Sequence, residues 1–197
     1  PSGAGKTTLA KALLAREENL RMSISFTTRL RRAKEVDGED YNFVNETKFK
    51  KMAEAGDFFE YAQVFGNYYG TPRIPTEEAL ASGSDILFDI DWQGTQQLEG
   101  NKNAGKDLVS VFILPPDNDE LETRLRTRAQ DADEEVQIRM AKAADEMSHY
   151  REYDYVIVNR YVEESVRMLR MILGAERLRA NRQSGIHNFV QILRGEA

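Results

Sequence analysis

A short run of small residues at the start of the chain ends in a lysine and a hydroxyl side chain. The run Pro1-Ser2-Gly3-Ala4-Gly5-Lys6-Thr7 matches all but the first glycine of the pattern G-x-x-x-x-G-K-[ST]. Small residues in that pattern let successive backbone N–H groups turn toward phosphate oxygens, and the helix that follows adds positive charge at its start. Lys6 can then reach the outer phosphates, and the Thr7 hydroxyl can ligate Mg²⁺. A glycine-rich turn without a ligand is the alternative, and Lys-Thr directly after Gly5 argues against it.

Two carboxylates follow a short apolar run later in the chain. Asp89 and Asp91 end the predicted strand 86–90 and are two residues apart, which places both on one face. The carboxyl edge of an open α/β sheet is where ligands bind. One of the two can hold magnesium through water, while the other orients an acceptor site or an arginine. Capping of a helix that begins at Trp92 is the structural alternative for Asp91, and both roles can coexist.

Apolar and amphipathic segments predict the α/β scaffold that must position these groups. Leu9 and Leu13, four residues apart among strong helix formers, predict a helix beginning near Lys6. Strands are predicted over 21–26, 86–90, 109–114 and 155–158, and helices over 75–82 and 163–182, with Gly185 ending the last. Because helical patterns separate the strands, parallel pairing with right-handed crossovers is expected. A further strand that leads into the phosphate run, ahead of Pro1, is expected in the middle of the sheet.

Two segments are predicted to stand apart from this scaffold. A strand at 41–44, a helix at 47–56, a strand at 58–61 and a turn at 66–70 suggest a small inserted lobe. The segment between Pro116 and Tyr155 has little aliphatic content and is dense in Arg, Asp and Glu, which predicts a solvated, movable helical flap.

Composition limits the classes of protein that remain. A length of 197 residues suits one compact domain with a modest insertion, and 41% hydrophobic with 30% charged residues is typical of a globular chain. No apolar run approaches the ~20 residues of a membrane span, and no secretory leader is recognisable. The absence of cysteine excludes disulfides and thiolate metal sites, so a cytoplasmic location is expected. The net charge of −6 disfavours nucleic acid and anionic membranes as partners, so an anion must bind at a local basic cluster.

Several further segments resemble the guanylate kinases in the family's order and spacing. They are Ser23–Arg29, Glu35–Tyr41, Gly66–Thr71 and Asp89–Gly94, and Ser148–Asn159 resembles the bacterial branch. The resemblance covers the chain up to its last dozen residues. It implies Mg²⁺-dependent transfer of the γ-phosphoryl group from ATP to GMP. The implied fold is that of P-loop nucleoside-monophosphate kinases, a parallel sheet flanked by helices: a core of residues 1–24, 72–116 and 155–197, an inserted GMP-binding lobe of residues 25–71, and a helical lid of residues 117–154.

The resemblance also implies an acceptor site. Arg29 and Arg32 supply bidentate donors to the GMP phosphate, and Tyr41 and Tyr69 supply hydroxyls. Taken singly, each arginine is equally a solvated loop charge and each tyrosine a packing residue. Guanine offers two adjacent donors, N1–H and the 2-amino group, which the carboxylate of Glu60 can accept; a solvent-facing strand residue is the alternative. The hydroxyls near the base are those of Ser25 and Thr71, and Asp89 and Asp91 border the same site.

The remaining implied residues bind the donor nucleotide and stabilise transferred charge. Arg124 and Arg128 are four apart on a predicted helix, and Arg139 follows on the next. Surface arginines are usually only solvated, but lid arginines brought in by closure can act on the transition state. Arg128 and Asn159 are expected to border the adenine. The implied donor-binding residues are Ser2, Gly3, Ala4, Gly5, Lys6, Thr7, Thr8, Arg128 and Asn159; the implied catalytic residues are Lys6, Arg29, Asp89, Arg124, Arg128 and Arg139.

Two other functions compete with this interpretation. One is a guanylate-kinase-like scaffold domain that binds phosphorylated proteins, against which the complete Gly5-Lys6-Thr7 run and the lid arginines argue. The other is a related small kinase with a non-guanine acceptor, against which Glu60 argues. Apolar residues at 189–193 predict a helix that packs on a neighbouring molecule, so a homo-oligomer is a further hypothesis.

Overall fold

The computed structural model describes residues 1–101, 104–129 and 133–196, and the side chains of residues 128–129 and 133–135 are outside that description. Its core contains two parallel strand pairs. β1 (Leu20–Met22) pairs with β6 (Asp85–Leu87), and β7 (Val111–Leu114) pairs with β8 (Tyr155–Val158). Helices separate the strands along the chain, as expected for parallel pairing. The α/β prediction is therefore confirmed.

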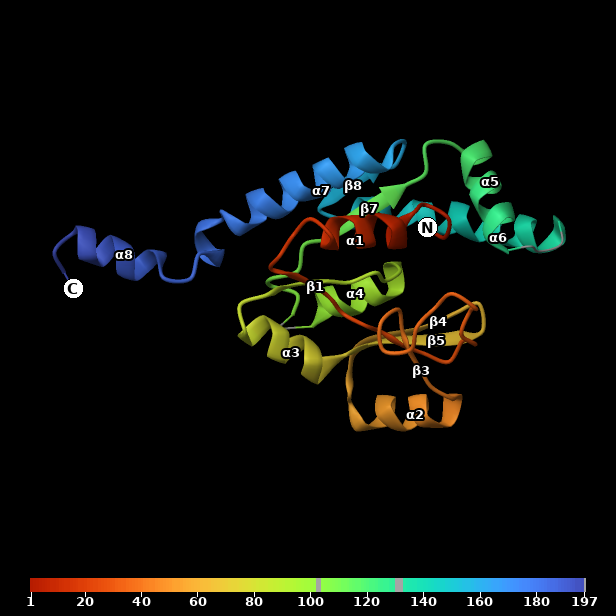
Figure 1. Ribbon diagram of the computed structural model, residues 1–197, viewed down its shortest axis with the longest axis horizontal. Helices are drawn as coiled ribbons and strands as arrows, with labels where there is room; N and C mark the ends of the chain where they lie inside the picture. Colours follow the sequence, from red (N-terminus) through yellow and green to blue (C-terminus); the bar gives the residue numbers. More distant parts are fainter. Residues whose placement is uncertain (102–103, 130–132, 197) are drawn as a thin grey trace.

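Helices α1 (Lys6–Leu14) and α7 (Val162–Arg177) pack against each other beside these strands (Figure 1). Their contact faces meet strands β7 and β8 in one buried cluster, which includes Leu9, Leu13, Ile113, Ile157 and Val166. The spacing of Leu9 and Leu13 thus buries one face of α1 in the core, and the predicted start of the helix near Lys6 is confirmed.

The inserted lobe is a four-stranded sheet with the order β3-β2-β5-β4. Its elements are β2 (Phe26–Thr27), β3 (Asn42–Phe43), α2 (Glu46–Ala55), β4 (Phe58–Val64) and β5 (Asn67–Pro72). Asn45 caps α2 through a hydrogen bond from the Lys48 N–H, and the Phe49 ring stacks on Phe58 at 4.7 Å. Aromatic packing between α2 and the hairpin β4–β5 therefore holds the lobe together.

The charged segment after the core strands forms α5 (Asn118–Ala129), α6 (Asp133–Met147) and the 3₁₀ helix η1 (Ser148–Glu152). The prediction of a helical segment is confirmed, but this segment also has a small core of its own. Leu121, Leu125 and Ala143 are buried, and Met140 and Met147 pack against them. The few aliphatic residues of the segment are thus concentrated where α5 meets α6.

Three element predictions were wrong. The predicted strand 21–26 is divided between β1 in the core and β2 in the lobe, because the chain passes from one sheet to the other there. The predicted turn 66–70 is mostly strand β5; the turn itself is Phe65-Gly66, both with positive φ, of 48° and 76°. The predicted helix 163–182 ends at Arg177.

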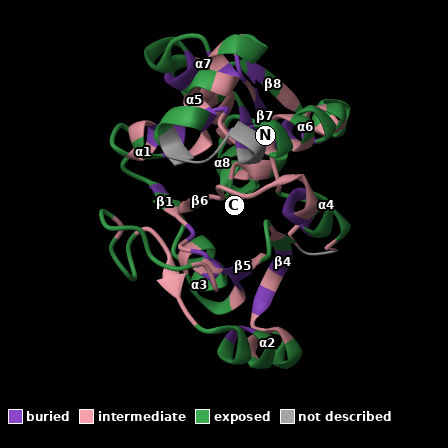
Figure 2. Ribbon diagram, turned by 90° about the vertical axis from the view of Figure 1, so that its right-hand side faces the viewer, coloured by how far each residue is buried: buried purple, intermediate pink, exposed green. Residues whose placement is uncertain are grey.

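Gly185 does not end α7 but precedes α8 (Ile186–Leu193), with φ 87° at the N-cap. Helix α8 confirms the helix predicted near the C-terminus, and it lies at the far end of the molecule from α5 and α6 (Figure 1). The two remaining core helices, α3 (Arg73–Ala81) and α4 (Trp92–Gly100), follow the lobe and β6 respectively. Figure 2 shows α4 beside β4, between the core and the lobe.

Candidate active site

The phosphate loop, residues 1–8, needs glycine at two positions. Gly3 and Gly5 have φ of 82° and 99°, in the left-handed region that side chains rarely adopt. A Cβ on Gly3 would lie 2.8 Å from Leu121 Cδ1 of α5, and a Cβ on Gly5 would lie 2.5 Å from Asn159 Nδ2. The loop is therefore packed closely between α5 and the segment after β8, with its amides at the N-terminus of α1.

Asn159 holds this loop from the side of the core. The buried Asn159 side chain donates from Nδ2 to the Ala4 carbonyl oxygen (2.8 Å), and its Oδ1 accepts from Ser165 Oγ (3.0 Å). Arg124 adds Nη1 to the same Ala4 carbonyl (3.3 Å) and Nη2 to the Asn159 carbonyl (3.4 Å). Both side chains thus position the loop, and the expected contact of Asn159 with adenine stays a prediction.

Other contacts of the loop involve its first residues. Lys6 Nζ donates to the Pro1 carbonyl (3.1 Å), so the lysine folds back over the loop. The Ser2 N–H donates to Glu146 Oε2 (3.0 Å), and this carboxylate of α6 is only 6% exposed. Sequence analysis missed Glu146, because one more acidic residue in a charged helix carries no signal of its own. Thr8 is exposed on the first turn of α1.

Thr7 and Asp89 form a direct pair at the start of α1. Thr7 Oγ1 donates to Asp89 Oδ2 at 2.6 Å, although the two residues are 82 positions apart. One hydroxyl and one carboxylate fit Mg²⁺, which prefers oxygen ligands and takes the others from water and substrate phosphates. Among the described residues no group of three His, Cys, Asp or Glu side chains could hold a metal ion. A magnesium site at Thr7 and Asp89 stays a prediction.

Asp91 serves as the N-cap of α4. Its Oδ1 accepts from the Gly94 N–H at 3.0 Å, and its Oδ2 accepts from Gln93 Nε2 at 3.1 Å. The capping alternative for Asp91 is therefore confirmed. Its role at the acceptor site stays a prediction.

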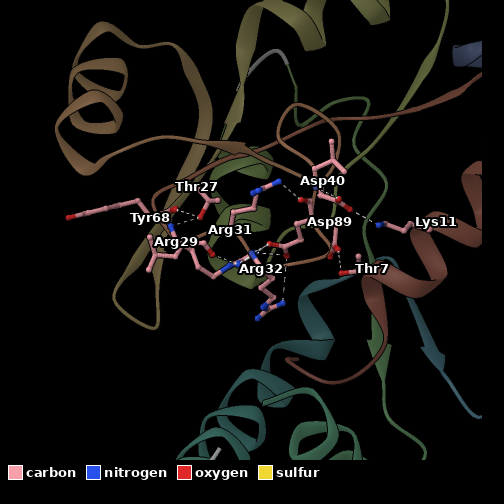
Figure 3. A network of polar contacts seen from close by, with 12 residues as sticks. Thr7, Lys11, Thr27, Arg29, Arg31, Arg32, Asp40, Tyr68 and Asp89 are labelled. Atoms are coloured by element: carbon pink, nitrogen blue, oxygen red, sulfur yellow. Dashed lines mark hydrogen bonds and ion pairs between the residues drawn. The ribbon is translucent and has the colours of Figure 1, made fainter. Parts of the chain in front are cut away.

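The arginines of the lobe are organised by Glu35. Arg29 binds this carboxylate with both guanidinium NH₂ groups, at 3.1 and 2.8 Å, and the Arg32 N–H donates to it at 2.8 Å. Arg31 donates to the Glu35 carbonyl (Figure 3). Figure 3 places this arginine cluster, the Thr7–Asp89 pair and the ion pair of Lys11 with Asp40 in one close view. Glu35 begins one of the segments that resemble the guanylate kinases, but the sequence did not predict that it binds Arg29 and Arg32.

The electrostatics of this cluster favour a fixed positive charge. Burial alone would lower the pKa of Arg29, but the hydrogen bonds and charge of Glu35, with a smaller contribution from Tyr69, raise it. The guanidinium of Arg29 lies 5.5 Å from the centre of the Tyr41 ring, and the Tyr41 and Tyr69 rings are 6.0 Å apart. The structure thus brings Arg29, Tyr41 and Tyr69 together, with Arg32 beside them.

Glu60 is the buried carboxylate of the lobe. Its residue is 4% exposed, it pairs with Thr71 across strands β4 and β5, and Thr71 Oγ1 donates to Glu60 Oε1. Burial raises the pKa of Glu60 from 4.5 to about 7, and the nearby charge of Asp91 acts in the same direction, while the Thr71 hydrogen bond opposes the shift. The alternative of a solvent-facing strand residue is therefore wrong. Ser25 is also buried, and its carbonyl accepts from the Asn42 N–H.

The arginines predicted to act from a lid are distributed over two places. Arg124 contacts the phosphate loop, as described above. Phe65 lies at the turn between β4 and β5. The guanidinium of Arg139 lies 5.7 Å from the centre of the Phe65 ring, and the Lys142 amine lies 4.1 Å from the same ring centre. Helix α6 therefore meets the tip of the lobe hairpin. Arg128 belongs to α5, but its side chain lies outside the described part of the structure.

The comparisons with known proteins agree in their result. The guanylate kinase family model matches residues 1–176. A guanylate kinase of Paramagnetospirillum magneticum is 58% identical over 195 residues, which span 99% of this chain and 90% of that protein. One from Rhodopseudomonas palustris is 56% identical over 196 residues, 100% of this chain and 88% of that protein. The chain belongs to the guanylate kinase family.

The structural comparison supports the same assignment. The crystal structure of guanylate kinase from Anaplasma phagocytophilum has a TM-score of 0.81 and 36% identity, and it covers 98% of this chain and 92% of its own. The P-loop nucleoside-monophosphate-kinase fold and the family resemblance are thus confirmed. The chain is an enzyme, a kinase that acts on GMP, and neither alternative function is favoured. In the described part of the chain no helix combines the length and apolar character needed to span a bilayer.

Proposed function

We propose that this guanylate kinase transfers the γ-phosphoryl group of ATP to GMP in the presence of Mg²⁺, giving ADP and GDP. The observation that carries the proposal is the burial of the Glu60 carboxylate, which accepts a hydrogen bond from Thr71 on the strand that also carries Tyr69. Tyr69 and Thr71 lie two residues apart on β5 and share one face of that strand. A nucleotide whose base meets Glu60 therefore has its phosphate on the side of Tyr69 and Arg29.

Glu60 and its neighbours select guanine in this proposal. The ionised carboxylate accepts N1–H and the 2-amino group, a pair of adjacent donors that adenine lacks. The hydroxyls of Thr71 and Ser25 border the base, and Asp91 contributes from the start of α4. Rejection of a base that leaves Glu60 without a partner is worth several kcal/mol, on the order of the cost of an unsatisfied buried polar group.

The acceptor phosphate is held by Arg29, Arg32, Tyr41 and Tyr69. Two guanidinium groups supply bidentate, charge-assisted hydrogen bonds, and two hydroxyls supply further donors. Glu35 keeps Arg29 in place before the phosphate arrives, because it binds both NH₂ groups of that guanidinium. The positive cluster also offsets the repulsion between the two phosphate-bearing substrates.

The donor phosphates are bound by residues 2–8 of the phosphate loop, at the N-terminus of α1. Lys6 moves from the Pro1 carbonyl to the outer phosphates, and backbone amides surround the phosphate oxygens. Thr7 and Asp89 would hold Mg²⁺, Asp89 through water. When bound, the ion neutralises charge on the donor phosphates.

The lid residues complete the site in this proposal. Phosphoryl transfer spreads charge over equatorial oxygens and is accelerated mostly by positioning and electrostatic stabilisation, so Arg124, Arg128 and Arg139 act from a lid that closes over the phosphates. Asn159 and Arg128 border the adenine. The division into a core, a GMP-binding lobe of residues 25–71 and a lid of residues 117–154 belongs to the same proposal.

Association with a second copy is proposed through α8. Residues 186, 189, 190 and 193 follow the spacing i, i+3, i+4, i+7, and these four apolar side chains are 37–70% exposed. Sedimentation of the wild-type chain and of Phe189→Asp tests this point: a heavier species lost in the variant supports it, and a monomer in both contradicts it.

A cytoplasmic location stays a prediction, to be checked by cell fractionation.

A coupled assay of ADP release with GMP, AMP and dTMP tests the proposed reaction. ADP release that requires ATP, Mg²⁺ and GMP, and that is far slower with AMP or dTMP, is the expected result. Binding of ATP and GMP without GDP formation, or equal rates with all three acceptors, contradicts the proposal.

A further inference from the structure

Gln97 fixes the position of helix α4 against strand β4. Its side-chain Nε2 donates to the Tyr61 carbonyl (2.8 Å), and its Oε1 accepts from the Tyr61 N–H (3.1 Å). One amide side chain thus occupies both backbone groups of Tyr61, as a neighbouring strand would. The helix is therefore held in register with the strand residue next to Glu60.

Gly94 lies one turn before Gln97 on the same face of α4. A Cβ built on Gly94 would lie 2.6 Å from Glu60 Oε2 and 3.0 Å from Glu60 Cδ, whereas Ile90 Cβ would be an ordinary neighbour at 3.4 Å. The carboxylate of Glu60 therefore fills the space that any side chain at position 94 would need. Gly94 is buried, so this space is closed to solvent.

We propose that Gly94 is a positioning residue for guanine selection, because its missing side chain leaves the place in which the Glu60 carboxylate is held. This inference rests on the proposed role of Glu60 and adds the backbone of α4 as the wall that sets its position. Three features act together: Gln97 holds the helix, Gly94 leaves the space, and Thr71 donates to the carboxylate from the opposite strand.

The backbone of Gly94 does not itself require glycine. Its φ is not positive, and an alanine within a helix is more favourable than glycine by ~0.5–1 kcal/mol. The atoms in the way are the end of a flexible side chain. Gly94→Ala is therefore expected to fold and to displace the Glu60 carboxylate away from α4 and from its hydrogen bond with Thr71.

Steady-state kinetics and thermal unfolding of Gly94→Ala test the proposal. The KM for GMP is expected to rise by about 10- to 100-fold, as for the loss of a hydrogen bond to a charged group. The KM for ATP and the unfolding temperature should stay at or near the wild-type values. Gly100→Ala, in the same helix and with no atom of the described residues within 4 Å of the added Cβ, is the matched control. It should leave both KM values unchanged and should not lower the unfolding temperature.

A double-variant cycle with Glu60→Ala separates this role from a merely structural one. If Gly94 acts through Glu60, Gly94→Ala changes the KM for GMP by less than about twofold once the carboxylate is gone. Equal effects of Gly94→Ala with and without the carboxylate overturn the proposal, as does an unchanged KM for GMP in Gly94→Ala alone.

Two further variants keep the outcomes distinguishable. If Gly94→Ala folds poorly, it is combined with Glu60→Asp, which shortens the side chain that carries the carboxylate. Recovery of folding in this double variant supports the steric contact between position 94 and Glu60. A double variant that folds as poorly as Gly94→Ala overturns the proposal. If Glu60→Ala alone keeps the wild-type preference for GMP over AMP, the assigned role of Glu60 fails, whatever Gly94→Ala shows.

Discussion

Replacing Glu60 by glutamine should make the protein more stable at alkaline pH and a poorer GMP kinase. The side chain keeps its shape and its neighbour Thr71 but cannot ionise. In the wild type the pKa of Glu60 is raised from 4.5 to about 7, chiefly by burial. Below pH 4.5 both folded and unfolded states are protonated; between 4.5 and 7 only the unfolded state loses its proton, so stability falls as pH rises. Above pH 7 the stability of the wild type is lowered by the full free-energy cost of ionising Glu60 in its buried site.

The magnitude follows from the two pKa values. A difference between 4.5 and about 7 corresponds to about 3 kcal/mol at ~1.36 kcal/mol per pH unit. Glu60 is 4% exposed, so little of this is lost to screening by solvent. Integrated between about pH 5.5 and about pH 8.5, the advantage of Glu60→Gln over the wild type should grow by about 2 kcal/mol.

Urea unfolding of both proteins at several pH values measures this difference. Any fixed effect of the amide on packing cancels, because only the change with pH is compared. A stability difference that is constant from about pH 5.5 to about pH 8.5 refutes the assignment of a raised pKa to Glu60.

The same titration should appear in GMP use. Only the ionised carboxylate accepts both guanine donors, so the KM of the wild type for GMP should be about tenfold higher at pH 6 than at pH 8. Glu60→Gln should lose the part of this dependence that belongs to the carboxylate. Since GMP itself titrates in this range, the comparison of the two proteins, and not either profile alone, decides the point.

The remaining predictions concern the donor side of the site. Asn159→Ala should lower stability by about 1–3 kcal/mol, because Ala4 and Ser165 lose their buried partner, and should raise the KM for ATP more than that for GMP. Equal KM values for ATP in the wild type and the variant would argue against a role of Asn159 in holding the phosphate loop. Asp89→Asn should raise the Mg²⁺ concentration needed for half-maximal rate, whereas an unchanged Mg²⁺ dependence would remove Asp89 from the metal site. Arg128→Ala should lower kcat far more than it weakens GMP binding, and a pure binding defect would contradict its role on the lid.

Local patterns explain which parts of the fold were predictable. The phosphate loop and α1 were predicted because glycine spacing and the leucines at 9 and 13 are signals within a few residues. The strand predicted over 21–26 failed because its residues have one continuous pattern but serve two sheets, and only the pairing partners of β1 and β2 separate them. Strand β5 was missed because Gly70 and Asn67 are typical turn residues, while Gly70 is needed to admit the Phe49 and Phe58 rings.

The residues of the candidate site also differ in how far the sequence could predict them. Single side chains such as Arg29 and Glu60 could be selected from the resemblance, but their partners could not. Glu35 and Glu146 act through hydrogen bonds to backbone or arginine groups, and acidic residues in charged segments are too common to stand out. The clamp by Asn159 joins residues 155 positions apart, and no spacing rule reaches that far.

Calorimetric titration of GMP and of AMP into the wild type and Glu60→Gln tests the central claim most directly. The buried carboxylate should give the wild type a strong preference for GMP, and that preference should largely disappear in the variant. A variant that prefers GMP as strongly as the wild type would show that guanine is recognised by other groups.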